Sequence, residues 1–206
     1  MHIESPDYEK AHAGVAVCDS PTGAFTYLGS FKPNGADSRD QTIFKDDDGK
    51  AYHICSSEWN STLYISLLTD DYTKPSGTYV RRFIGQSREA PAVFKRNGYY
   101  YMLSSGCTGW DPNKAKWAVS DSMMGVWELK DKPCLGRDAD KTFYAQSTYV
   151  LPIEGMQDQF IAMFDRWNKT DLINSRYVWL PIEFDGDRPL IRWADQWSTQ
   201  TMEAVY

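Results

Sequence analysis

The amino-acid sequence predicts an all-β fold. Short segments rich in aromatic and β-branched residues recur along its 206 residues, and clusters of turn-forming residues separate them. No long stretch shows the apolar spacing of an amphipathic helix. The chain is long enough to bury a core, so we expect one domain over residues 1–206.

The expected strands follow one another at short intervals. Turn residues such as DDDG (46–49) and KRNG (95–98) precede two of them, and MHIE (1–4) reads as the end of an earlier strand. The strands are expected at AYHICSS (51–57), TLYISLLT (62–69), YYYMLSS (99–105), KWAVSDS (116–122), QFIAMFD (159–165) and SRYVWLPIEF (175–184).

A weak internal repeat favours a β-propeller. The turn before residues 51–57 has its glycine at Gly49, and the turn before residues 99–105 has Gly98, 49 residues later. A degenerate unit of about 50 residues with two to four strands is typical of a propeller blade. A β-sandwich is the alternative.

Composition excludes some classes of partner. The net charge of −6 disfavours nucleic acid, which attracts basic surfaces. No apolar run is long enough to span a membrane. The 8 Trp and 13 Tyr exceed what a core usually needs, and surplus aromatic side chains are common where sugar rings or bases are stacked.

No metal site is predicted. The four Cys have no CxxC or Cys/His spacing, and the three His lack a common ligand spacing. We expect buried free thiols, with disulfides as the alternative. The DDDG segment lacks the rest of a calcium loop, so a solvated hairpin turn is expected. No cofactor is required, and calcium is the alternative ligand.

Two carboxylates occupy equivalent places in successive repeats. SRDQTIFKDDDGKAY begins at Ser38 and SREAPAVFKRNGYYY at Ser87, which aligns Asp40 with Glu89. Inner strands of adjacent blades converge, and two converging carboxylates suit glycoside hydrolysis. The alternative is that both acids cap turns. Since a nearby arginine would lower the pKa of the acid, we expect the neighbouring Arg39 and Arg88 to face outward.

These two segments, with SGCTGWDPN (105–113), YAQSTYV (144–150) and FDRWN (164–168), resemble glycoside hydrolase family 43. They are most similar to its galactan-degrading branch, which includes exo-β-1,3-galactanases. The resemblance implies a five-bladed β-propeller that hydrolyses with inversion. It implies that Glu89 is the general acid and that Asp40 tunes and orients it. Gln146 is implied to position or activate water, with a hydrogen bond to the sugar as the alternative.

The resemblance also implies features beyond the acid pair. The sequence begins at what looks like the end of the first blade of the family, so we expect about four blades. Such a propeller has open sheet edges, through which we expect a homodimer to form. Relatives are mostly secreted or periplasmic, but no signal peptide begins this sequence. Sugar contacts are expected, with packing as the alternative for each, from Glu4, Trp59, Asn60, Thr108, Trp110, Asp165 and Arg166.

The resemblance thus implies an oligosaccharide or polysaccharide partner and an inverting exo-glycosidase acting on β-linked galactan or related plant side chains. One alternative is a non-catalytic propeller that binds the polymer. The other is a glycosidase of the same family directed to arabinan or xylan.

Overall fold

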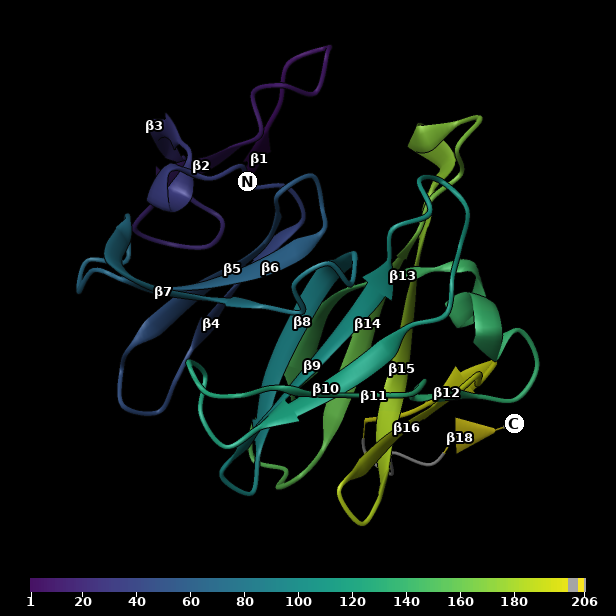
Figure 1. The fold of residues 1–206 in the computed structure, drawn as a ribbon. Coiled ribbons are helices and arrows are strands. Elements are labelled where there is room, and N and C mark those ends of the chain that lie inside the picture. Colours follow the sequence, from purple (N-terminus) through teal and green to yellow (C-terminus); the bar gives the residue numbers. More distant parts are fainter. Residues whose placement is uncertain (200–203, 206) are drawn as a thin grey trace. The chain divides into compact units, whose positions relative to one another are not determined.

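The computed structural model describes residues 1–199 and 204–205 and shows an all-β chain (Figure 1). It forms two compact units, residues 1–89 and residues 90–206. Short 3-10 helices are its other regular elements, at Pro33–Gly35, Ala139–Tyr144 and Leu172–Asn174.

The first unit contains two antiparallel sheets, with strand orders β1-β2-β3 and β4-β5-β6-β7. Every residue of β5 is buried, because this strand pairs with a neighbour on each side. The strands are β1 (His2–Ile3), β2 (His12–Val17), β3 (Thr26–Phe31), β4 (Gln41–Lys45), β5 (Ala51–Ser57), β6 (Thr62–Leu68) and β7 (Pro75–Arg82).

The second unit contains a four-stranded sheet, β11-β10-β9-β8, and a five-stranded sheet, β12-β16-β15-β14-β13, in which β12 runs parallel to β16. The first two residues of β8, Arg88 and Glu89, belong to the first unit. A two-stranded pair follows, β17 with β18. The strands are β8 (Arg88–Arg96), β9 (Tyr99–Gly106), β10 (Lys116–Ser120), β11 (Glu128–Lys130), β12 (Cys134–Leu135), β13 (Gln146–Pro152), β14 (Phe160–Arg166), β15 (Arg176–Asp185), β16 (Arg188–Arg192), β17 (Gln196–Trp197) and β18 (Ala204–Val205).

The strand predictions are confirmed. The segment expected at 51–57 is β5, and the other expected strands differ from the observed ones by a few residues at their ends. Gly49 and Gly98 have φ values of 85° and 79°. Only glycine adopts this backbone without a steric cost, which is why each marks a hairpin turn. The repeat is a four-stranded meander in chain order, the structure of a propeller blade rather than of a Greek-key sandwich.

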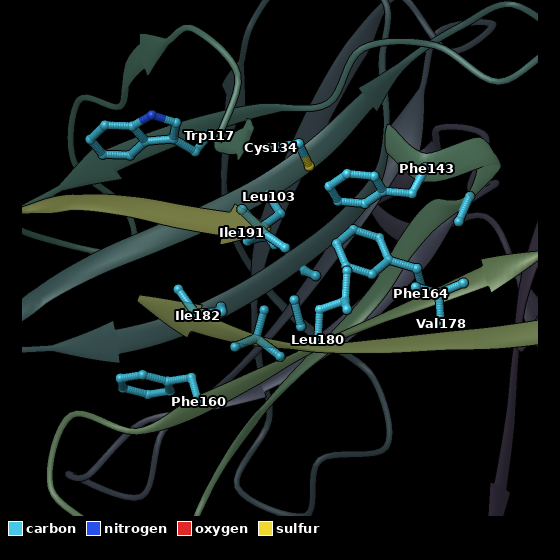
Figure 2. Close-up of a cluster of buried hydrophobic side chains, with 14 of the residues drawn as sticks. Leu103, Trp117, Cys134, Phe143, Phe160, Phe164, Val178, Leu180, Ile182 and Ile191 are labelled. Atoms are coloured by element: carbon cyan, nitrogen blue, oxygen red, sulfur yellow. The ribbon is translucent and has the colours of Figure 1, made fainter. Parts of the chain in front are cut away.

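A hydrophobic core stabilises the second unit. Figure 2 shows its side chains gathering from several strands, with Leu180 and Phe164 among those that are 1% exposed. Trp197 lies against this cluster, and Trp193, which is 37% exposed, packs on Phe143 with ring centroids 5.8 Å apart. The cluster comprises Ala92, Phe94, Tyr101, Leu103, Trp117, Cys134, Ala139, Phe143, Ala145, Val150, Phe160, Ala162, Phe164, Val178, Leu180, Ile182, Ile191 and Ala194.

The four cysteines are free thiols. Cys55 and Cys134 are buried as expected, and burial raises the pKa of each thiol to about 12. The expectation of burial was wrong for Cys107, which is exposed in the polar loop after β9, and for Cys18, which is half-buried just after β2, because neither lies on a strand. Within the described residues, no helix is long and apolar enough to cross a membrane.

Candidate active site

Ser56 brings the two acid-bearing motifs together in the first unit. This fully buried residue near the end of β5 donates its N–H to the carbonyl of Asp40 at 2.8 Å and accepts the N–H of Arg39 at 2.9 Å. Its hydroxyl donates to the carbonyl of Arg88 at 3.2 Å. The backbones that carry Asp40 and Glu89 are therefore fixed to one strand, although the two acids are 49 residues apart.

Asp40 is half-buried just before β4 and lines a cavity of about 560 Å³ within the first unit. The cavity wall combines polar groups, including Arg39, Gln41 and His53, with apolar residues such as Phe31. Burial lowers the pKa of His53 to about 4, so its imidazole is neutral at pH 7. A volume of this size is in the range of small-ligand sites.

Glu89 is half-buried at the start of β8 and accepts a hydrogen bond from Asn60. The distance from Asn60 Nδ2 to Glu89 Oε1 is 2.7 Å. An amide N–H that donates to Oε1 fixes the orientation of the carboxyl group. Asn60, which the sequence offered as a sugar contact, thus touches the candidate acid itself.

The expectation that Arg39 and Arg88 face outward was wrong. Their exposed fractions are 7% and 5%. Burial lowers the pKa of Arg88 to about 10, because its effect is larger than the opposite effect of the Glu89 charge. Arg39 forms an ion pair with Asp37. Both cations are buried because adjacent carboxylates compensate for the loss of water.

The loop that carries Asn60 has an uncommon backbone. Glu58, Trp59 and Asn60 have consecutive φ values of 52°, 55° and 62°. For residues other than glycine this left-handed region costs on the order of 1 kcal/mol each, so surrounding contacts must hold the loop.

Asp37 supplies those contacts. Its Oδ1 accepts the N–H of Glu58 at 2.7 Å and the hydroxyl of Ser57 at 3.1 Å, and its Oδ2 accepts the N–H of Trp59 at 3.0 Å. Burial raises the pKa of Asp37, but these hydrogen bonds and the Arg39 charge outweigh it and hold the pKa below its ordinary value. Sequence reasoning missed Asp37 and Ser56. The available signal for Asp37 was an arginine with an acid on each side in ADSRD (36–40).

Trp59 is 66% exposed, and one face of its indole ring lies against the Arg39 guanidinium, whose carbon is 4.5 Å from the ring centroid. Such a contact is a cation–π interaction. The ring is thus held in place while most of its surface stays open to solvent, as a stacking platform requires.

The Glu4 carboxylate is used in local contacts. It accepts the N–H groups of Ser5 and Ala11, each at 2.9 Å, and pairs with His2 at 3.0 Å. Burial raises the pKa of Glu4, but the lowering effect of these hydrogen bonds is larger, and the resulting pKa is about 2. Glu4 therefore closes the loop between β1 and β2, and its contact with sugar stays a prediction.

Gln146 lies at the start of β13 in the second unit, half-buried, with Nε2 donating to the Ser105 hydroxyl at 2.7 Å. Next to it, the hydroxyl of Ser147 donates to the carbonyl of Ala90 at 2.7 Å, which fixes the start of β13 to β8. One N–H of the Gln146 amide is used by Ser105, which fixes the orientation of the side chain, and its carbonyl oxygen can accept a hydrogen bond from water or a hydroxyl.

Asp165 is the register partner of Gln146, so the two side chains share one face of the sheet formed by β13 and β14. Burial raises the pKa of Asp165. A half-buried carboxylate with a raised pKa is a feature of functional sites.

We expect Asp165→Asn to raise the free energy of unfolding at pH 7. The pKa of Asp165 is higher in the folded state than in the unfolded chain, so its ionisation destabilises the fold as pH rises above about 4. The gain over the parent protein should therefore be larger at pH 7 than at pH 4, as measured by urea denaturation at both values. Equal gains, or the same pH trend in the exposed control Asp121→Asn, would contradict this assignment.

The loop after β9 presents Trp110, which is 53% exposed. Its ring meets that of Trp167 edge to face at 6.2 Å, and Trp167 Nε1 donates to the Trp110 carbonyl at 3.0 Å. The Thr108 hydroxyl donates to the Asp111 carbonyl at 2.5 Å and so serves the loop itself. A groove of about 490 Å³ adjoins Trp110 and Trp167 within this unit.

Arg166, at the end of β14, is used in packing. Its Nε and Nη2 both donate to the carbonyl of Phe143, at 3.1 Å and 2.5 Å, and its guanidinium carbon lies 4.9 Å from the ring centroid of Trp193. It also lines the groove beside Trp110. The packing role is thus observed, and sugar contact stays a prediction.

The DDDG segment is a hairpin turn between β4 and β5, in which the N–H of Gly49 donates to the carbonyl of Asp46 at 3.0 Å. Lys50 Nζ lies 2.6 Å from Asp48 and neutralises part of its charge. Among the residues that the structure describes, no group of three or more His, Cys, Asp or Glu side chains could hold a metal ion.

Known structures share this fold at substantial sequence identity. A β-1,3-galactosidase of family GH43, BT3683, solved with galactodeoxynojirimycin, is 43% identical with a TM-score of 0.90, over 92% of this chain and 68% of its own. A second, BT0265, is 40% identical with a TM-score of 0.92, over 95% of this chain and 41% of its own. An exo-β-1,3-galactanase from Phanerochaete chrysosporium, solved with β-1,3-galactotriose, is 38% identical with a TM-score of 0.88, over 96% of this chain and 45% of its own.

A curated relative is the β-D-galactofuranosidase xynD of Aspergillus niger, 32% identical over 137 residues. The match covers 65% of this chain and 38% of that protein, so the chain spans well under half the length of this relative. The model of glycosyl hydrolases family 43 matches residues 4–147, more than half of the chain and a range that includes both acid-bearing motifs. The chain therefore belongs to glycosyl hydrolases family 43.

Proposed function

We propose that the protein is an inverting exo-glycosidase that hydrolyses β-linked galactan. The observation that carries the proposal is the pairing of Asn60 with Glu89, in a motif that Ser56 fixes to the backbone of Asp40. Similarity to β-1,3-galactosidases and to an exo-β-1,3-galactanase solved with β-1,3-galactotriose supports this substrate class.

Glu89 is the general acid of this proposal. It protonates the leaving glycosidic oxygen, while the Asn60 amide holds its carboxyl group in place through Oε1. Asp40 tunes and orients the acid, since a second carboxylate favours the protonated form of the first. Inversion requires water to attack the opposite face of the sugar as the leaving group departs.

Gln146 places that water. One N–H of its Nε2 donates to Ser105 and holds the side chain in place, and its carbonyl oxygen accepts a hydrogen bond from the water and orients it. A neutral amide is a weak base, and orientation is the contribution that this side chain can make in its ordinary form. Trp59 and Trp110, both largely exposed, supply stacking surfaces for galactose units.

The test is a panel of polymers. The protein is incubated with β-1,3-galactan, arabinan and xylan, and the released sugars are identified by mass, with the anomer of the first product followed by NMR. Galactose released as the inverted α-anomer is expected from galactan alone. Pentose from arabinan or xylan would move the substrate to another branch of the family. Binding of galactan without any product would favour the non-catalytic alternative.

A homodimer belongs to the same proposal. Strand β3 pairs with β2 on one side, and in the described part of the chain no strand pairs with its other edge. Such an edge can accept a strand from another copy. Sedimentation velocity should then show a larger species at higher protein concentration, and a constant monomer would exclude the dimer.

A further inference from the structure

We propose that Asp37 is a positioning residue for catalysis, which acts by holding the loop at residues 58–60 so that Asn60 reaches Glu89. The inference rests on the proposed role of Glu89 as the general acid. Asp37 is not one of the two aligned acids, Asp40 and Glu89, and it precedes the motif that begins at Ser38.

The first step is the capture of the loop. The Asp37 carboxylate accepts two consecutive backbone N–H groups, those of Glu58 and Trp59, at 2.7 Å and 3.0 Å, and the Ser57 hydroxyl at 3.1 Å. These donors lie 20 to 22 residues away in sequence, where β5 ends. Both carboxylate oxygens are therefore occupied by the loop, as in a cap at the end of a regular element.

The second step is the backbone that this capture imposes. Three consecutive non-glycine residues with φ between 52° and 62° turn the chain sharply, and this turn precedes the side chain of Asn60. An unsupported loop would relax toward the ordinary negative φ values and carry Asn60 away.

Arg39 supports the same loop from its other side. It forms an ion pair with Asp37, donates through Nη2 to the carbonyl of Tyr8 at 3.1 Å, and lies under the Trp59 ring at 4.5 Å. One ion pair therefore holds the backbone of Trp59 through Asp37 and its indole through Arg39.

The third step is the contact with the acid. Asn60 Nδ2 donates to Glu89 Oε1 at 2.7 Å, and this contact orients the carboxyl group of the acid. Proton transfer requires the acid within hydrogen-bond reach of the leaving oxygen, and a displacement of about 1 Å can cost about 100-fold in rate. Asp37 thus acts on the reaction without touching the substrate.

Kinetics on β-1,3-galactan oligosaccharides test this sequence of contacts. Asp37→Ala is expected to lower kcat/KM by about 10- to 100-fold. It should also move the alkaline limb of the pH profile upward, because the carboxylate loses a hydrogen bond that favours its charged form. Asn60→Ala should do the same, and the double variant should be no worse than Asn60→Ala, since both act through one contact. Additive losses in the double variant would overturn the proposal.

Asp37→Asn is the conservative variant. The asparagine oxygen can still accept a backbone N–H but lacks the charge that pairs with Arg39, so its kcat/KM should lie between the parent protein and Asp37→Ala. If Asp37→Ala fails to fold, this variant carries the test. Full activity together with an unshifted pH profile in Asp37→Asn and Asp37→Ala would overturn the inference.

A second readout does not depend on turnover. The side-chain NH₂ resonances of Asn60, assigned with Asn60→Ala, should follow the titration of Glu89 in the unmutated protein and lose this response in Asp37→Ala. If no polymer is cleaved, the proposed function fails while this titration still tests the positioning role. An Asn60 signal that follows Glu89 equally with and without Asp37 would overturn that role.

Discussion

Glu89→Gln is expected to lower kcat/KM on β-1,3-galactan by about 10²- to 10⁴-fold, the usual contribution of a general acid. The amide keeps the size of the side chain and can still accept the hydrogen bond from Asn60 Nδ2 on its oxygen. It has no proton acidic enough for the leaving oxygen. The measurement is the initial rate of galactose release by both proteins at the pH optimum of the parent.

Glu154→Gln is the matched control, because Glu154 is an exposed glutamate in the turn after β13. It undergoes the same chemical change and should keep the activity of the parent protein. Circular dichroism should show the same fold in all three proteins. Full activity of Glu89→Gln would remove Glu89 from the role of general acid.

Leu180→Ala is expected to lower the free energy of unfolding by about 2–5 kcal/mol. Leu180 is 1% exposed on β15 and packs in the core of the second unit, so truncation leaves a cavity lined by apolar side chains (Figure 2). A typical domain has about 5–15 kcal/mol of stability in total, so this change removes a large part of it. Urea denaturation followed by tryptophan fluorescence measures the difference.

The control here is the same substitution at an exposed site. Leu151 on β13 is 41% exposed, and Leu151→Ala should change stability by less than about 0.5 kcal/mol. Similar losses for both variants would mean that burial in this core does not decide the stability of the second unit.

The positions of the strands could be predicted from the sequence because their signals are local. Aromatic and β-branched residues fill β5, β9 and β15, and the glycines before β5 and β9 have the positive φ that a tight hairpin requires. The alignment of Asp40 with Glu89 was also visible, since two similar motifs begin successive repeats. Both signals lie within short stretches of sequence, so they can be recognised without knowing which distant segments pack together.

The tertiary structure alone decided what surrounds those acids. Asn60 and Glu89 are 29 residues apart, and Asp37 lies 21 residues from the first amide that it accepts. An asparagine or aspartate has many partners available in the unfolded chain, and packing selects one. The error over Arg39 and Arg88 has a related cause. Their acidic neighbours Asp37 and Glu89 were visible in the sequence, but the burial of both arginines depends on the strands that pack around them, which only the folded chain shows.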